Sequence, residues 1–199
     1  GGHSADGNTN WRVYAKQFDR GPGTLPDDET PHDAWWQART GFRLDRDMDS
    51  TKTDRFTIQG DYYIGKDGQS GVYAVDVPPT YSEEVIEDAD VAGQNVLARW
   101  THIIDEDSDW ALQTYYNRFT RKEFVLNSTT NIFDVDFQHR FPMGTRHELI
   151  WGLGYRYNAD DLIGNGFDLT FDPPNIRTNL PSAFVQDQVT LVDDRWYFT

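Results

Sequence analysis

The acidic side chains are the first places where this sequence could do chemistry. Asp105, Asp107 and Asp109 occupy alternate positions, which is the spacing found at the start of calcium-binding loops. The sixth position of such a loop needs glycine and the twelfth needs a bidentate glutamate, but Trp110 and Tyr116 stand there. The pattern therefore favours a solvated turn. A second acidic cluster favours a solvated loop over a site for divalent cations, and it consists of Glu83, Glu84, Glu87, Asp88 and Asp90.

No other residue pattern indicates catalysis or a bound metal. The sequence has no cysteine, which removes disulfides and thiolate metal ligands. Its five histidines lack the spacing of metal ligands: His3, His32, His102, His139 and His147. No Ser/His/Asp order, phosphate-binding loop or supported pair of carboxylates is present. We therefore expect no enzymatic activity, no metal and no cofactor.

The composition limits the partners and the architecture. The 199 residues carry a formal charge of −15 and their basic residues form no run, which argues against nucleic acid as a partner. No stretch approaches the roughly 20 consecutive apolar residues of a spanning helix, so only strands could cross a membrane. The aromatic content of 15% is high for so acidic a chain. Aromatic residues collect where one end of the ring is dry and the other is wet, as in the girdles of membrane barrels.

Alternation of apolar and polar side chains is the main structural signal, because successive side chains of a strand point to opposite faces. In residues 34–45, Trp36, Phe42 and Leu44 alternate with Arg39 and Arg43. The alternation recurs at 56–64, 133–141 and 149–157, and more weakly at 11–16, 96–101, 110–119 and 183–191, the last with Asp187 on its apolar side. About eight strands and a stub at 196–199 result. Each is near the roughly 9–11 residues of a tilted membrane strand, whereas strands of soluble proteins typically have about 5–6.

The connections give a second clue, because short and long ones alternate along the chain. The short ones are residues 47–53, 105–109, 142–146 and 193–195, and the long ones are 19–33, 65–90, 120–130 and 158–179. Outer-membrane barrels have short periplasmic turns and long extracellular loops. We therefore expect an all-β, antiparallel up-and-down meander that forms part of a transmembrane β-barrel. Residues 1–10 would then be the tail of a preceding strand and a periplasmic turn.

Several phrases of the sequence resemble the barrel of TonB-dependent outer-membrane receptors. They are WRVYAKQFDR at 11–20, GFRLD at 41–45 with FTIQGD at 56–61, FDVDFQHRF at 133–141, LIWGLGYRY at 149–157 and SAFVQDQ at 182–188. The resemblance covers nearly all of the chain and lies in the order and spacing of the phrases. It implies a barrel of about 22 strands closed around an N-terminal plug, with residues 1–199 as one part of it.

The resemblance also implies a location and a set of partners. The location is the outer membrane of a Gram-negative bacterium, and the partners are outer-membrane lipid and lipopolysaccharide, the plug domain, a small-molecule ligand, and TonB, which would bind a region that precedes this segment. The function implied is the TonB-dependent uptake of a siderophore-like metal chelate or another scarce nutrient. Because the plug, the TonB-contacting segment and the final strands are absent from these residues, we expect this segment not to transport alone.

The basic side chains on the polar sides of the strands are the candidate binding residues. Seven of them lie there: Arg12, Lys16, Arg39, Arg43, Arg99, Arg140 and Arg156. Cationic and aromatic groups suit an anionic chelate. We expect the ligand-binding vestibule at the extracellular mouth to be lined by Lys16, Gln37, Arg39, Tyr63, Asn117 and Arg156. The alternative for each basic residue is a salt bridge to the plug or to a carboxylate on the same face, and the carboxylates available are Asp45, Asp61, Asp134, Asp136 and Glu148.

Two other functions stay open. A porin-type barrel without a plug would share the alternation, and an upstream plug of roughly 130 residues would exclude it. A secreted, soluble all-β carbohydrate-binding module would explain the aromatic residues and the acidity. It would not explain the length of the strands or the alternating connections, and it would be soluble without detergent.

Overall fold

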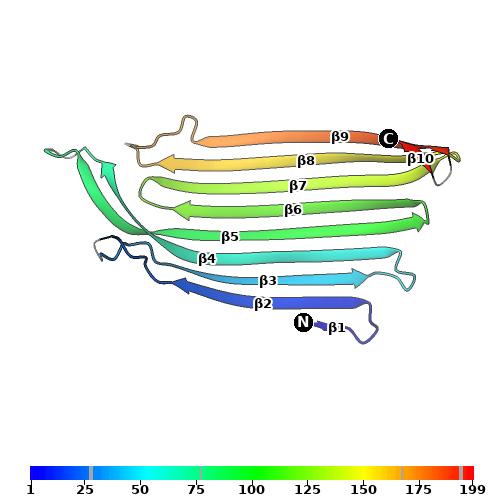
Figure 1. Cartoon of the computed structure of the whole chain (residues 1–199), viewed down its shortest axis with the longest axis horizontal. Helices are drawn as coiled ribbons and strands as arrows, with labels where there is room; N and C mark the ends of the chain where they lie inside the picture. Colours follow the sequence, from blue (N-terminus) through cyan, green and yellow to red (C-terminus); the bar gives the residue numbers. More distant parts are fainter. Residues whose placement is uncertain (27–28, 77, 167, 193–194) are drawn as a thin grey trace.

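The computed structural model describes residues 1–26, 29–76, 78–166, 168–192 and 195–199. Ten strands run through these residues: β1 (Gly2–His3), β2 (Thr9–Arg20), β3 (Trp35–Asp47), β4 (Asp54–Ala74), β5 (Ser82–Asp105), β6 (Ser108–Lys122), β7 (Leu126–Met143), β8 (His147–Gly164), β9 (Asn175–Val192) and β10 (Trp196–Phe198). They form one antiparallel sheet in which each strand pairs with its neighbour in sequence (Figure 1). This confirms the predicted all-β meander. Within the described ranges, no helix has the length and apolarity that a membrane crossing requires.

The register of the strands places the predicted apolar side chains on one face of the sheet. Leu44 pairs with Ile58, Ile58 with Ala98, and the row continues to Val135 and Tyr155. Directly paired residues of antiparallel strands point to the same side. This apolar face carries Trp11, Val13, Trp36, Phe42, Leu44, Phe56, Ile58, Tyr62, Ile64, Val96, Ala98, Trp100, Trp110, Leu112, Tyr116, Phe133, Val135, Phe137, Leu149, Trp151, Leu153, Tyr155 and Val185. The other side is the polar face, to which Lys16, Arg39, Tyr63 and Arg156 belong.

The described residues form a single layer without a packed core. Ala89 and Ala159 are the only buried hydrophobic residues among them, whereas Val13, Leu153 and Val185 of the apolar face are more than half exposed. A sheet with one apolar face normally buries that face against a second layer. Exposed apolar patches larger than a few hundred Å² are uncommon on soluble monomers. The apolar face is therefore uncovered, and neither a second sheet nor a helix of the described chain stacks on it.

One end of the sheet carries short turns, as predicted, and we call it the turn end. Residues 48–53, 106–107 and 144–146 connect β3 to β4, β5 to β6 and β7 to β8. Gly144 has a φ of +73°, a conformation that glycine adopts without strain in a tight turn. Residues 4–8 join β1 to β2 at the same end, which agrees with a turn in the first ten residues. Of the predicted connection 193–195, residues 193–194 lie outside the described residues.

The opposite, loop end differs from the prediction. The connections predicted at 65–90, 120–130 and 158–179 are mostly strand, because β4 continues to Ala74, β6 to Lys122 and β8 to Gly164. Only residues 75–81, 123–125 and 165–174 join these strands to the next, so the β6–β7 connection is not long. The prediction was wrong because a strand with polar side chains on both faces shows no alternation, while its backbone ladder forms all the same. The connection between β2 and β3, residues 21–34, is long as expected.

The longest hairpin extends beyond the rest of the sheet (Figure 1). We call its outer part, residues 67–74 of β4 and 82–90 of β5, the β4–β5 arm. The arm contacts the ends of other strands: Tyr73 packs on Phe124 with ring centroids 5.1 Å apart, and the Ala74 amide donates to Asp168 Oδ1 over 2.9 Å. Asp168 lies in the β8–β9 connection. The arm therefore contacts the β6–β7 and β8–β9 connections.

Candidate functional site on the polar face

Most arginines of the polar face are paired with carboxylates on neighbouring strands. Arg39 Nη2 lies 3.1 Å from Asp61, which also accepts a hydrogen bond from the Tyr14 hydroxyl. Arg156 Nε donates to Asp134 over 2.7 Å. Arg55 likewise pairs with Asp47 of β3, and Arg140 with both Asp109 of β6 and Glu148 of β8. Arg43 pairs instead with Asp45 of its own strand β3. The salt-bridge alternative is therefore the observed state of Arg39, Arg43, Arg140 and Arg156.

Five of the six predicted binding residues lie in three adjacent rows of the polar face. Lys16, Arg39 and Tyr63 are direct partners across β2, β3 and β4. Gln37 lies one row nearer the loop end, opposite Gly65. Asn117 lies one row nearer the turn end, in the row that runs through Asn95 to Asp61.

Arg156 lies apart from that group. It is on β8 and pairs in register with Asp134 of β7 and Leu180 of β9. Several strands therefore separate it from the row of Lys16, Arg39 and Tyr63. A ligand that contacts the first group would need to be large, or the sheet strongly curved, for Arg156 to take part.

Lys16 is the cation of this group that is free to meet a ligand. No ion pair involves it within the part of the chain that the structure describes, and its Nζ lies 5.8 Å from the centre of the Tyr14 ring. The Tyr14 hydroxyl, the Asp61 carboxylate and the Arg39 guanidinium form a connected cluster next to it. Tyr14 and Asp61 were missed as site residues because their contact joins positions 47 apart in sequence.

Two glycines shape this surface. The Tyr63 ring lies against Gly93 and the Tyr14 ring against Gly41, so closely that a Cβ atom at either glycine would overlap the ring. Each tyrosine therefore lies along the sheet rather than standing away from it. Each glycine pairs in register with the tyrosine itself, and this pairing can be recognised only once the register of the strands is known.

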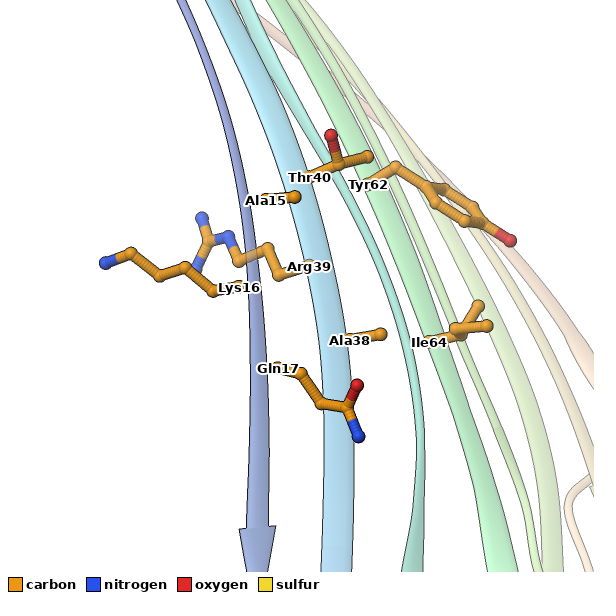
Figure 2. Close-up of a pocket in the computed structure, with 8 residues that line it drawn as sticks. All are labelled: Ala15, Lys16, Gln17, Ala38, Arg39, Thr40, Tyr62 and Ile64. Atoms are coloured by element: carbon orange, nitrogen blue, oxygen red, sulfur yellow. The ribbon is translucent and has the colours of Figure 1, made fainter.

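A hollow near these residues opens on the other face. It has a volume of about 470 Å³, and small side chains of Ala15, Ala38 and Thr40 leave it open beside Tyr62 and Ile64. Figure 2 shows that Lys16 and Arg39 point to one side of the sheet, whereas Tyr62 and Ile64 point to the opposite side. The hollow is therefore a feature of the apolar face and not a ligand site between Lys16 and Arg39.

Two tiers of aromatic residues border the apolar face. The turn-end tier joins β5 to β8 through ring contacts, with Trp100 5.0 Å from Trp110, Trp110 6.2 Å from Phe137, and Phe137 5.3 Å from Trp151. The loop-end tier consists of Tyr62, Tyr116, Phe133, Tyr155 and Tyr157. The side chains between the two tiers include Ile58, Ala98, Leu112, Thr114, Val135 and Leu153.

The polar atoms of three of these aromatic residues bond away from the middle of the face, whereas Trp151 Nε1 donates to His139 in its own row. Trp100 Nε1 donates to Asp54 Oδ1 over 3.0 Å, and Asp54 is the first residue of β4 at the turn end. At the other tier, Tyr116 donates to Asn131 over 3.0 Å and Tyr155 to Asn179 over 2.6 Å. Each asparagine lies one row nearer the loop end than the tyrosine that donates to it. The middle of the face is therefore apolar, and hydrogen-bonding groups lie along its two borders.

Two carboxylates on the apolar face, both near its turn end, each contact a histidine. Asp187 pairs in register with Leu149, so the expectation that it falls on the apolar side is confirmed, and His147 Nδ1 lies 2.7 Å from its carboxylate. Asp54 likewise lies 2.8 Å from His102 Nδ1. Such pairing reduces the cost of placing a carboxylate beside apolar surface.

The acidic turns do not come together as a metal site. In the β5–β6 turn, the Asp107 amide donates to Asp105 Oδ1 over 2.9 Å, which is a local turn bond. Within the described ranges, no three histidine or carboxylate side chains form a group that could hold a metal ion. The turn 48–53 is closed by Asp49, which accepts from the Thr51 and Thr53 hydroxyls and from the Asp54 amide. These bonds, that of Thr51 first, hold the pKa of Asp49 far below its ordinary value.

The fold defines an all-β class, a one-layer antiparallel meander. No protein-family model matches the chain, and no curated protein matches it. Among solved structures, the chain is similar to one described as the copper transporter OprC, with a TM-score of 0.40 and 10% sequence identity over 94% of this chain and 40% of that one. The chain thus spans less than half the length of that transporter.

Proposed function

We propose that this chain is part of the wall of a transmembrane β-barrel in a bacterial outer membrane. The observation that carries the proposal is the uncovered apolar face, bordered by two aromatic tiers in which Trp100, Tyr116 and Tyr155 donate hydrogen bonds outward. Trp110 and Tyr116 mark the two borders on β6 and are six residues apart. At ~3.3 Å per residue they are about 20 Å apart along the strand, near the roughly 25 Å height of the apolar band of such barrels. In this orientation the turn end is periplasmic and the loop end extracellular.

The polar face then lines the lumen, and its function is transport. Because Arg39, Arg140 and Arg156 are bound to carboxylates, their charges brace neighbouring strands. Lys16 supplies a free positive charge beside Gln37, Tyr63 and Asn117, in the half of the lumen nearer the extracellular end. We infer that an anionic ligand docks there, as a siderophore-like metal chelate or another scarce anionic nutrient would. The favoured mechanism is TonB-dependent uptake through a longer receptor with a plug domain.

The whole protein tests this function. The gene that contains this sequence would be deleted in its host, and accumulation of radiolabelled iron, supplied as a ferric hydroxamate complex and as a ferric catecholate complex, would be compared with and without a protonophore. A receptor of the proposed kind gives saturable accumulation of a complex that the protonophore and the deletion both abolish. The same comparison with radiolabelled cobalamin covers the nutrient alternative.

The same cells separate the rival functions. A porin-type barrel would let a small solute enter without saturation and despite the protonophore. A secreted carbohydrate-binding module would be recovered in the soluble fraction after lysis rather than in outer-membrane vesicles. Recovery of the protein in the soluble fraction would contradict the membrane proposal itself.

A further inference from the structure

A hollow opens on the polar face in the turn-end half of the sheet, away from Lys16. It has a volume of about 270 Å³ and lies over one row of paired residues that runs from β5 to β9: Arg99, Gln113, Asp136, Gly154 and Ser182. This row is six residues nearer the turn end than the row of Lys16 and Tyr63, which reaches β5 at Gly93. The next row toward the turn end also lines the hollow, through Ala111, Gln138 and Phe184.

Glycine leaves the floor of the hollow bare. Gly154 has no side chain, and Phe137 and Leu153, which also line the hollow, have their side chains on the apolar face. A Cβ atom at Gly154 would overlap Ser182 Oγ and Asp136 Oδ1. These two oxygens approach the bare backbone from opposite sides, because Asp136 is on β7 and Ser182 is on β9.

An aromatic ring forms the turn-end side of the hollow. Phe184 lies so close to Gly152, its partner in register, that a Cβ atom at Gly152 would overlap the ring. The ring therefore lies over the sheet, and Phe184 is 51% exposed. It offers an apolar surface beside the polar side chains of the hollow.

Most of the polar side chains around the hollow have no partner within the part of the chain that the structure describes. Asp136 shares a hydrogen bond with Asp134, which Arg156 holds by an ion pair. No hydrogen bond or ion pair in the described ranges involves four of the other side chains, namely Arg99, Gln113, Gln138 and Ser182. Their donors and acceptors are therefore available to a ligand.

The lining selects against a ligand with a net charge. The Asp136 carboxyl disfavours an anion, and the unpaired Arg99 guanidinium disfavours a cation. Glutamine amides and a serine hydroxyl both donate and accept hydrogen bonds, as the hydroxyl groups of a ligand do. Small-molecule sites usually have roughly 300–1,000 Å³, so this hollow suits a single ring rather than a chain of rings.

We propose that this hollow binds one neutral sugar ring. A C–H face of the ring lies on Phe184, and its hydroxyl groups hydrogen bond to Asp136, Ser182 and the two glutamine amides. A pyranose suits the hollow because it has an apolar face and a rim of hydroxyl groups at once. The inference goes beyond the proposed function, because the hollow is separate from the Lys16 group and an anionic chelate does not suit it.

Saturation-transfer NMR of the full-length protein in phosphatidylcholine vesicles tests the inference, with no glycosidic detergent present to compete. The probes are the methyl pyranosides of glucose, galactose and mannose, and the charged comparison ligands are gluconate and glucosamine. At least one neutral pyranoside should bind more tightly than both charged compounds, with the strongest saturation on the hydrogens of one ring face. Failure of all three pyranosides to bind, tighter binding of a charged compound, or even saturation over the ring would overturn the inference.

A pair of phenylalanine variants tests the ring contact. Phe184→Ala should weaken binding of the pyranoside about tenfold, which equals about 1.4 kcal/mol and is near the upper end of what an aromatic contact contributes. The matched control is Phe18→Ala, which removes a 45% exposed phenylalanine from the polar face of β2, outside the hollow, and should leave the affinity unchanged. Equal loss in the two variants would refute the site.

A pair of serine variants tests the polar contacts. Ser182→Ala removes one hydroxyl from the hollow and should weaken binding several-fold, whereas Ser128→Ala removes a hydroxyl from the polar face of β7 at its loop end and should not. Far-ultraviolet circular dichroism of every variant checks that the sheet content is retained. Unchanged affinity of the Ser182 variant and of the Phe184 variant would likewise refute the site.

Uptake and sugar binding fail separately. A protein that accumulates the ferric chelate in cells but binds no pyranoside refutes this site and leaves the proposed function standing. A protein that binds the pyranoside but supports no uptake refutes the proposed function and leaves this site standing.

Discussion

At the residue scale, the polar face carries both ion-paired basic residues and unpaired ones, and Arg156 and Lys16 are an example of each. Arg156 is bound to Asp134, whose side chain is only 10% exposed, so removing Arg156 leaves that carboxylate without its cation. Lys16 has no such partner in the described chain. The two basic residues therefore differ in what their loss should change, although sequence reasoning placed both in the same binding group.

We predict that Lys16→Gln in the full-length protein weakens binding of the transported anion about tenfold and leaves stability unchanged. One charge-assisted hydrogen bond contributes about 1.5 kcal/mol, which accounts for that loss. Arg156→Gln should instead lower the free energy of unfolding by about 1 kcal/mol, because a half-exposed ion pair is lost. Urea titration of the protein in lipid vesicles and ligand-binding isotherms measure the two effects. The reverse assignment, with Lys16 affecting only stability, would contradict the account.

The Asp49 turn gives a prediction for pH. Its pKa is below the ordinary value in the folded chain, chiefly because of the Thr51 hydroxyl. The carboxylate therefore stabilises the turn at pH values above the ordinary aspartate pKa of about 3.9, and this contribution is lost as the pH falls from there through the lower folded pKa. Thr51→Val should raise the pKa of Asp49, as followed by the carboxyl carbon resonance in an acid titration. An unchanged titration curve would exclude the hydroxyl as the main cause.

At the element scale, the strands could be predicted from the sequence where one face is apolar and the other is polar. Residues 34–45 and 149–157 alternate because one side is apolar and the other polar, and β3 and β8 contain them. The strand residues 67–74 and 82–90 were read as a loop, because Gln69 and Glu87, which hydrogen bond across the arm, are as polar as a loop would be. Side chains alternate only where one face of a strand is in apolar surroundings and the other in polar ones. Neither face of the arm is in apolar surroundings, so its side chains do not alternate.

The candidate site was predictable to a similar extent. The alternation correctly placed Lys16, Arg39 and Tyr63 on one face, and their adjacency follows from the hairpin register. The bond from Tyr14 to Asp61 and the contact of Tyr63 with Gly93 could not be predicted, since both depend on which residues stand opposite each other across strands.

The β4–β5 arm yields a prediction at the same scale. Its tip is held by the hydrogen bond that the Ala74 amide donates to Asp168. The pKa of Asp168 is below its ordinary value, mainly because of the hydrogen bond from Asn165 and then because of that from the Ala74 amide. Asp168→Ala should therefore accelerate hydrogen exchange of the Ala74 amide several-fold, because the amide loses its acceptor. Asp168→Asn keeps an acceptor oxygen and should have a smaller effect.

A matched control excludes a general effect of charge in that connection. Asp172→Ala removes a carboxylate from the same β8–β9 connection, and no hydrogen bond of Asp172 is described. It should leave exchange at Ala74 unchanged. Equal acceleration in the Asp168 and Asp172 variants would show that the arm is not held by this bond.

At the scale of the whole molecule, the sheet has one layer and two open edges. No pairing joins β1 to β10 among the described strands, and the edge strands of an isolated sheet invite pairing with other chains. The apolar face also exposes a larger continuous apolar surface than soluble monomers usually do. We therefore predict that the 199-residue chain alone aggregates when diluted from urea into buffer and retains its sheet when diluted into neutral detergent. A monodisperse β-sheet protein in buffer, measured by light scattering and circular dichroism, would support the soluble-module alternative.

The contact between the apolar face and hydrocarbon is the central claim, and the lack of cysteine makes it directly measurable. Single cysteines at positions 133–138 of β7, placed one at a time in the chain reconstituted in vesicles, would carry a nitroxide label. Its accessibility to oxygen and to a water-soluble nickel chelate would then be compared. We predict a period of two, with oxygen favoured at Phe133, Val135 and Phe137 and the nickel chelate favoured at Asp134, Asp136 and Gln138. Equal accessibility of all six positions to the nickel chelate, or protection of the apolar positions from both reagents, would contradict it.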